Sequence, residues 1–540
     1  MSSRCNLKKV KGDINFNNLK NDEMTEYEEF ISSKNDNITS NKKEVSFIDD
    51  IMQIIFLGVG ASSLSIVKVP YYISLILTII FIALIGIINI YFSYYTLIDI
   101  IDENKNNPAI IDETKNKKEI IDNTKKKSKR RSIKNKKQVK EKEKEEDKKE
   151  EKKEDKKEEK KEEKEKEKEE EIKRRIDFFN DICKDLNIFN IPFIFGEIII
   201  HQILIYRSLG GIVNIIGEFN YDSLFIFLSD TYWRELSMKF VVNIIFCLLL
   251  LFPLYLKIDA ETIESLPIIG FNIILFIVLG VFIQFFYYFI YYCKTEINYR
   301  DISIYPNKRE CPSKIFQSLS IFFYCYSGHN GFFNIIPMDK KLKKPEIRRK
   351  EFMYASISSM VIYFIFSCLG FLSVPKDVVD NVIEKKRFWN KDIVMTFSRI
   401  LLLPFCVFKI IINLDKLRYI FFCNKLKNIP FFTKLRKFLF CKKKEIDEEL
   451  KVIFTFFILS ITCICASLYQ NIVGYITIIG GFFVPIPTFL IPQIKLKKYI
   501  EKEFKCNFSN WRRIIFGIIL CLFGIVGSIF GIIDIFKGEL

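Results

Sequence analysis

The sequence predicts an all-α polytopic membrane protein with about eleven transmembrane helices. Of its 540 residues, 49% are hydrophobic and 54 are Phe, although 27% are charged and the formal net charge is +17. Charged and apolar residues are separated along the chain, because uncharged runs of about 20 residues, the length that crosses a bilayer, recur throughout it. A soluble protein of this length would divide into several domains and would not contain such runs.

The N-terminal part is polar up to residue 45 and lacks the pattern of a cleaved signal peptide, so we expect residues 1–45 to be a disordered cytosolic tail. Transmembrane helices are expected in 46–103 and 176–536, and 537–540 form a short C-terminal tail. The predicted spans are 48–67, 71–98, 188–216, 238–256, 267–292, 314–338, 352–375, 392–414, 450–469, 471–494 and 513–536. A polar triplet at 469–471 divides the uncharged run 452–494 into two of them.

Residues 125–175 hold much of the charge. This block contains 26 Lys or Arg and 18 Asp or Glu, so 44 of its 51 positions are charged. We expect 104–175 to be a disordered cytosolic loop, in which i,i+4 Lys/Glu pairs leave partial helix open. A second interpretation is that its basic part, 125–140, docks on anionic lipid. Nucleic-acid binding is not expected, because the block lacks interleaved aromatic residues.

Lys and Arg beside the spans predict the orientation. The basic links 340–350, 416–444 and 495–513 all follow even-numbered spans, as does the charged block. The N-terminus is therefore expected in the cytosol and the C-terminus on the outer or lumenal side. The fifth link, 293–313, weakens this pattern with its four basic residues, and a disulfide between Cys293 and Cys311 is geometrically possible there.

Soluble-enzyme chemistry and metal binding find no support in the sequence. The chain has two His residues and no phosphate-binding loop, and half of its 14 Cys residues lie inside spans as small apolar fillers. We therefore expect no enzyme activity, no ATP-driven transport, no metal and no cofactor. The informative residues are the polar groups inside spans, because burial in lipid is costly for them unless they face a cavity or a partner.

Two spans contain small and polar residues near their middle. In the first span they are Gly58, Gly60, Ala61, Ser62 and Ser63, and in the sixth they are Ser327, Gly328, His329 and Asn330. Such residues weaken a helix and free backbone groups to bind a ligand; close helix packing through small residues is the alternative. Interruptions in the first and sixth spans, five spans apart in the chain order, indicate a transporter built from inverted five-helix repeats. Its substrate would lie between the two breaks.

Three short motifs resemble those of the amino acid/auxin permease family. They are the aromatic run 323–330 followed by a leucine-basic-Pro-x-x-Arg element at 342–348, the glycine element 60–67 of the first span, and Ser398-Arg399 with Pro404 in the eighth. Ala61, Ser62 and Val67 depart from the family pattern. The resemblance implies eleven helices as two inverted five-helix repeats plus one, with helices 1 and 6 broken. It also implies that the substrate α-carboxylate meets the amides of 58–63 and its ammonium meets 327–330.

Glu197 and His201 lie four residues apart in the third span and therefore share a helical face. The hypothesis is that they relay a coupling proton, with the carboxylate holding the imidazole; the alternative is a structural ion pair. His329 is a further candidate because it lies in the sixth break. Arg207 and Lys409 are expected to snorkel toward the membrane surface.

The eighth span offers the alternative coupling site. A sodium ion between the first and eighth helices would use Thr396 or Ser398, but the loss of the hydroxyl at Ala61 favours proton coupling. Arg399 matches the family motif and is expected to face the inner vestibule.

The sequence therefore predicts a proton-coupled secondary active transporter of amino acids that works by alternating access. A sodium-coupled transporter and an amino acid-sensing transceptor with little flux stay open, whereas a channel is disfavoured because no span carries repeated polar residues at helical spacing. The expected partners are amino acids and the lipid bilayer. The expected membrane is the plasma membrane or a vacuolar or lysosome-like membrane, and the oligomeric state is left open.

Overall fold

The computed structural model describes residues 47–102, 190–210, 212, 231–292, 312–328, 345–373, 381–384, 393–423, 446–494 and 508–537. Within these ranges the secondary structure is helical, with short turns and no strand, which confirms the predicted all-α class. The predicted tail 1–45, the loop 104–175, His329, Asn330 and the two loop cysteines lie outside the described residues. Residues up to Asp50 belong to a separate unit, and the description below concerns Ile51 onward.

The first predicted span is interrupted. Its helices are α2 (Phe47–Gly58), α3 (Ala61–Ser65), η1 (Ile66–Lys68) and α4 (Val69–Ile73). The segments before and after the interruption are bent by 59° from each other. Ser74, with φ of 75°, then separates α4 from α5 (Leu75–Asp102), the second span. The first span thus runs six residues beyond the predicted end at 67, because Pro70 lies in the first turn of α4 and is tolerated there.

Each of the other predicted spans is helical in its described part. After the helix Asn190–Gly210 come α8 (Thr231–Ile244), the π-helical turn η3 (Ile245–Leu251), α9 (Phe252–Lys257) and α10 (Ala260–Tyr292). These are followed by α11 (Pro312–Cys325) with η5 (Tyr326–Gly328), α13 (Pro345–Phe364) with η7 (Ile365–Leu369) and α14 (Gly370–Ser373), η8 (Val382–Glu384) and α15 (Ile393–Cys423). The last are α17 (Ile446–Leu468), α18 (Ile472–Phe482), η11 (Ile486–Leu490) and α20 (Phe508–Lys537).

The division of the long apolar run at 469–471 is confirmed. Helix α17 ends at Leu468 and α18 begins at Ile472, and Asn471 caps α18 by accepting a hydrogen bond from the Gly474 amide at 2.9 Å. The half-buried Arg207 reaches this same break, where its guanidinium donates to the Gln470 carbonyl at 2.6 Å. The side chain satisfies a backbone group that the interrupted helix cannot.

In the described part of the chain, eight helices are long and apolar enough to cross a membrane, or nine with the bent first pair. Val452–Leu468 is a shorter apolar helix, and α11 is described only as far as the sixth break. Each predicted span thus coincides with helical structure, while the total of eleven and the repeat layout stay predictions. The polytopic, all-helical class is established.

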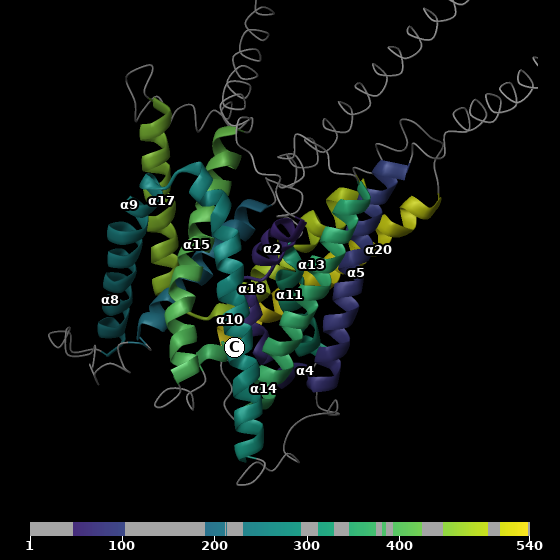
Figure 1. The fold of residues 1–540 in the computed structure, drawn as a ribbon, viewed down its shortest axis with the longest axis horizontal. Helices are drawn as coiled ribbons and strands as arrows, with labels where there is room; N and C mark the ends of the chain where they lie inside the picture. Colours follow the sequence, from purple (N-terminus) through teal and green to yellow (C-terminus); the bar gives the residue numbers. More distant parts are fainter. Residues whose placement is uncertain are drawn as a thin grey trace, which may run out of the picture. The chain divides into compact units, whose positions relative to one another are not determined.

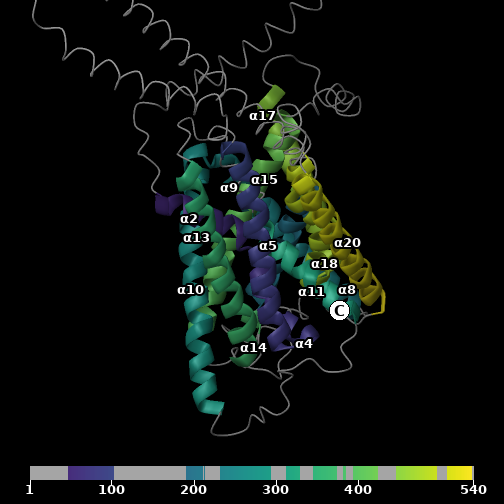
Figure 2. The same ribbon diagram turned by 90° about the vertical axis from the view of Figure 1, so that its right-hand side faces the viewer.

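Helices α11, α18 and α20 pack tightly against one another (Figures 1 and 2). A side chain on Gly480 of α18 would meet the Ser320 carbonyl of α11 at 2.1 Å, and one on Gly481 would meet the Gly524 carbonyl of α20 at 2.1 Å. Glycines here allow the helix backbones to approach closely. Helix α5 lies against α13, and α10 lies against α15. The broken first span is enclosed by these helices, with Phe56, Val59 and Ile66 fully buried.

Candidate functional site

The break in the first span ends one helix and starts another within three residues. After α2 ends at Gly58, the Gly60 amide bonds the Gly58 carbonyl at 3.1 Å, and α3 begins at Ala61. Ser63 supports the turn, since its hydroxyl and its amide both donate to the Gly60 carbonyl, at 2.6 and 3.1 Å. The last carbonyls of α2 have lost their helical partners and carry the negative end of the helix dipole. Two of them, at Leu57 and Gly58, accept hydrogen bonds from other helices.

Lys409 of α15 donates to the first of these carbonyls. Its ammonium lies 3.1 Å from the Leu57 oxygen and 4.6 Å from the centre of the Phe56 ring. The side chain is only 2% exposed, so the expectation that Lys409 snorkels is wrong. The ammonium stays inside because a helix end and an aromatic face, both of which attract cations, lie within its reach.

Glu197 lies beside the same break as Lys409. Its carboxylate, in a residue 5% exposed, accepts a hydrogen bond from the Asn413 amide of α15 at 2.8 Å. A Cβ atom on Gly60 would lie 3.3 Å from a Glu197 carboxylate oxygen and 3.8 Å from the Lys409 nitrogen. A buried carboxylate and a buried ammonium therefore flank Gly60, where the missing side chain keeps the backbone accessible to both. We call Glu197, His201, Lys409 and Asn413 the charged side of the break.

His201 shares a face with Glu197, as its spacing predicts, but the carboxylate does not hold the imidazole. Instead, Nδ1 of the fully buried ring donates to the backbone carbonyl of Glu197 at 2.6 Å. This contact assigns the proton to Nδ1. Within the part of the chain that the structure describes, Nε2 has no hydrogen-bond partner. The imidazole thus presents an unpaired acceptor beside the charged side of the break.

Tyr363 of α13 donates to the second of these α2 carbonyls, that of Gly58. Its hydroxyl bonds the Gly58 carbonyl at 3.2 Å and also bonds the carbonyl of Cys325, the last residue of α11. One hydroxyl thus connects the first break to the sixth. Tyr326, at the start of the sixth break, donates to the Ile82 carbonyl of α5 at 2.9 Å. The sequence gives Tyr363 no special mark, because it is one of several aromatic residues in its span.

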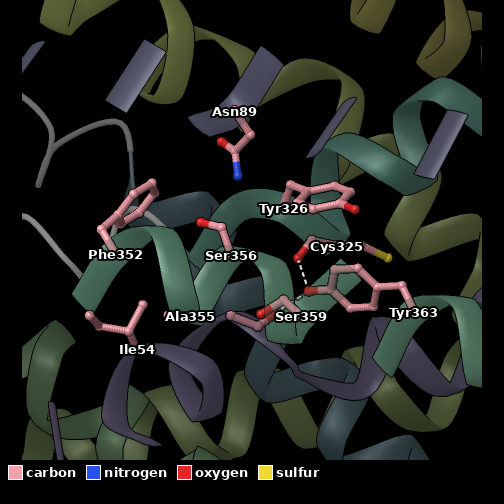
Figure 3. Close-up of a pocket in the computed structure, with 10 residues that line it drawn as sticks. Ile54, Asn89, Cys325, Tyr326, Phe352, Ala355, Ser356, Ser359 and Tyr363 are labelled. Carbon is pink, nitrogen blue, oxygen red and sulfur yellow. Dashed lines mark hydrogen bonds between the residues drawn. The ribbon is translucent and has the colours of Figure 1, made fainter. Parts of the chain in front are cut away.

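A small cavity of about 20 Å³ lies beside this contact, between α2, α5, α11 and α13. Figure 3 shows the Asn89 amide directed from α5 toward Ser356 and Tyr326. Asn89 is 1% exposed, and neither of its amide atoms has a hydrogen-bond partner among the described residues. A cavity of this size and polarity holds about one water-sized group. Its ten lining residues, none of them charged, are Ile54, Gly58, Asn89, Cys325, Tyr326, Phe352, Ala355, Ser356, Ser359 and Tyr363. We call Asn89, Ser356, Ser359 and Tyr363 the neutral side of the break.

The structure places the other predicted site residues in different surroundings. Ser327 is buried and ends the described part of the sixth span together with Gly328, while Ala61 and Ser62 begin α3. Thr396 is half-buried on α15. Ser398 is turned away from the first break, since its hydroxyl donates to Val394 at 2.9 Å and lies 3.0 Å from where a Gly280 side chain would begin on α10.

Arg399, which is expected at an inner vestibule, contacts the link between two spans in this structure. Its guanidinium donates twice to the Ile383 carbonyl, at 3.2 and 2.9 Å. Ile383 belongs to η8, in the link between the seventh and eighth spans. The side chain is 2% exposed and fixes this link to α15. Its role in this structure is therefore to hold a connection between spans.

The family model for transmembrane amino acid transporter proteins matches residues 175–537. The chain belongs to this family. No curated protein matches the chain. The matched region includes Glu197, Lys409 and Tyr363, so the residues that contact the first break from outside belong to the family domain. The break itself and Asn89 precede it. Membership establishes a multi-pass membrane protein of an amino acid transporter family and gives no support to an enzyme.

Proposed function

We propose that this protein is a proton-coupled secondary active transporter of amino acids, working by alternating access around the first and sixth breaks. The observation that carries the proposal is the pair of buried opposite charges, Glu197 and Lys409, that flanks Gly60. Buried ionisable groups are costly within a membrane protein and mark ion or proton pathways. A break with free backbone groups and an adjacent pair of charges supplies both a substrate site and a group that a proton can neutralise.

Proton coupling fits this site better than sodium coupling. The Leu57 carbonyl, which a metal cation at the end of α2 would use, already accepts from the Lys409 ammonium at 3.1 Å. Ser398, one of the two hydroxyl candidates for a sodium site, faces α10. The Lys409 ammonium, which is part of the chain, therefore takes the place that a bound metal cation would have at the end of α2. A proton is then the mobile charge, with Glu197, Lys409 and His201 as the groups that can exchange it.

An amino acid zwitterion suits the two breaks, which we place in a core of two inverted five-helix repeats plus one helix. The substrate carboxylate would meet the amides at the start of α3, and its ammonium would meet the carbonyls at the ends of α2 and α11. The single proton of the Tyr363 hydroxyl is shared between two of those carbonyls in this structure, at Gly58 and Cys325. Substrate binding would therefore compete with the Tyr363 hydroxyl. From the basic links that follow even-numbered spans, we propose that the N-terminus lies in the cytosol.

The test is uptake into liposomes that contain the purified full-length protein. A panel of labelled amino acids is offered with an imposed pH gradient, in sodium-containing and sodium-free buffers. We expect concentrative uptake of some amino acids without sodium, and its loss in Glu197→Gln and Lys409→Gln. Lys257→Gln, which removes an exposed charge at the end of α9, is the control and should transport normally.

Uptake that requires sodium and ignores the pH gradient would exclude proton coupling. Uptake that keeps its pH dependence in Glu197→Gln would exclude the proposed role of the charged side. If no amino acid is taken up, although one binds and stabilises the protein, the sensing function replaces transport.

A further inference from the structure

We propose that a groove between α5 and α20 binds the phosphate headgroup of an anionic phospholipid. The groove has a volume of about 470 Å³. Its lining residues are Ile87, Ile88 and Tyr91 of α5 and Arg512, Arg513 and Phe516 of α20. Two of these six described residues are basic and none is acidic. This site lies on the outer surface of α5 and is separate from the two breaks.

The groove lies at the start of the apolar span of α20, where we place the edge of the membrane. This span begins at Trp511, directly before Arg512 and Arg513. The rings of Phe92 and Phe516 stack with their centres 5.7 Å apart, which fixes the two helices to each other at this level. Trp511 is 47% exposed, as is typical of an aromatic residue at the headgroup level. Phospholipid phosphates occupy the same level of a bilayer.

The chemistry of the lining matches the two parts of a phospholipid. Neighbouring guanidinium groups bind phosphate through paired N–H donors. Ile87, which is 61% exposed, and Phe516, at 38%, form an apolar wall that an acyl chain can cover. Arg512 and Arg513 also interact with other groups of the chain. A guanidinium has five N–H donors, so both retain capacity for a phosphate. Free phosphate would use the arginines but not the apolar wall.

The groove is connected to the candidate site through α5. Ile87 and Tyr91 are exposed on this helix, whereas Asn89 between them lines the cavity beside the breaks. Helix α20 in turn packs against α11, which carries the sixth break. A lipid that bridges α5 and α20 therefore holds two helices of the candidate site in one arrangement, and its loss should slow transport if the proposed function is correct.

The test measures lipid binding directly, so it does not depend on transport. Full-length protein is reconstituted in phosphatidylcholine with or without phosphatidylglycerol, extracted in mild detergent, and its retained lipids are counted by native mass spectrometry. We expect retained phosphatidylglycerol in the unmodified protein. In Arg512→Gln/Arg513→Gln its affinity should fall on the order of thirtyfold, from two lost basic contacts. The control Lys257→Gln/Lys350→Gln removes two exposed basic residues elsewhere and should retain the lipid.

A second variant protects the test against misfolding of the first. Ile87→Trp fills the groove and keeps both arginines, and it should also lose the lipid. Equal retention in all variants, or equal loss in the control, would overturn the proposal. Displacement of the lipid by inorganic phosphate alone would show a simple anion site instead. Binding that appears only after deletion of 125–175 would show that acidic residues of this block occupy the groove, which also overturns the proposal.

Discussion

The charged and neutral sides of the first break satisfy neighbouring carbonyls in different ways. The Leu57 carbonyl accepts from the Lys409 ammonium, whereas the Gly58 carbonyl accepts from the Tyr363 hydroxyl. A hydroxyl contact exchanges with water at a net cost of about 1 kcal/mol, while a buried ammonium needs a compensating charge. The neutral side is therefore suited to open and close, and the charged side is suited to respond to a proton.

The charged side is not explained by stability. Removing two charges from water costs several kcal/mol for each ion, and a well-packed apolar pair would often be as stable. Each charged group has its own hydrogen-bond partner. The Glu197 carboxylate accepts from Asn413, and the Lys409 ammonium donates to the Leu57 carbonyl. Their retention beside Gly60 points to use in transport.

The largest expected effect comes from removing one charge of the charged side. Glu197→Gln leaves the Lys409 ammonium buried without a nearby carboxylate. We expect the variant to lose about 3 kcal/mol of stability, together with pH-driven uptake. Thermal unfolding of the purified protein and uptake into liposomes measure the two effects. In Glu197→Gln/Lys409→Met, stability should recover while uptake stays absent; recovery of both would make the pair structural.

A smaller effect is expected on the neutral side, from Tyr363→Phe. The change removes one hydroxyl and leaves the Gly58 and Cys325 carbonyls without this donor, at a cost of about 1–3 kcal/mol. The two breaks should separate more often. Labelling of the buried Cys325 thiol, followed by mass spectrometry, should therefore become faster.

Tyr326→Phe is the matched control for this variant. Its hydroxyl donates to the Ile82 carbonyl of α5 at 2.9 Å, a contact that does not connect the breaks. Faster labelling in both variants, or in neither, would contradict a specific role for Tyr363.

The sequence predicts the framework of both sides and misses most of their contacts. Uncharged runs locate the spans, small residues locate the first break, and spacing places Glu197 and His201 on one face. Lys409, by contrast, finds its carbonyl 352 positions away, and Tyr363 finds its carbonyl 305 positions away. Such pairs depend on how each helix is rotated about its axis. The same rotation turns Ser398 toward α10 and Arg399 toward η8, which the eighth-span motif does not reveal.

Replacing the unpaired amide of the neutral side should separate stability from transport. Asn89→Leu removes a buried polar group that lacks partners among the described residues, so we expect stability to stay equal or rise by about 1 kcal/mol. Uptake should nevertheless fall several-fold, because the cavity beside the Tyr363 contact loses its polar group. Melting temperature and uptake are measured on the same preparations.

Gln284→Leu is the control for this variant. Gln284 lies on α10, is 5% exposed and has an unpaired carbonyl oxygen in the described part of the chain, but it does not line the cavity. It should gain stability without losing uptake. Equal loss of uptake in the two variants would show that Asn89 has no special role in the cavity.

The smallest expected effect comes from Gly60→Ala, which adds one methyl group between the two charges. The new Cβ atom would lie 3.3 Å from a Glu197 oxygen and 3.8 Å from the Lys409 nitrogen, so the carboxylate must move by only a few tenths of an ångström. The fold should tolerate this change at less than about 1 kcal/mol. Uptake at saturating substrate should fall about two- to fivefold, because the methyl group separates both charges from the backbone of the break. Gly210→Ala, whose Cβ atom would meet nothing within 4 Å, should behave like the unmodified protein. The effect of Gly60→Ala should be local to the charged side. In the Glu197→Gln/Lys409→Met background, adding Gly60→Ala should therefore leave substrate binding unchanged. A binding defect that persists in that background would place the role of Gly60 in the substrate site alone.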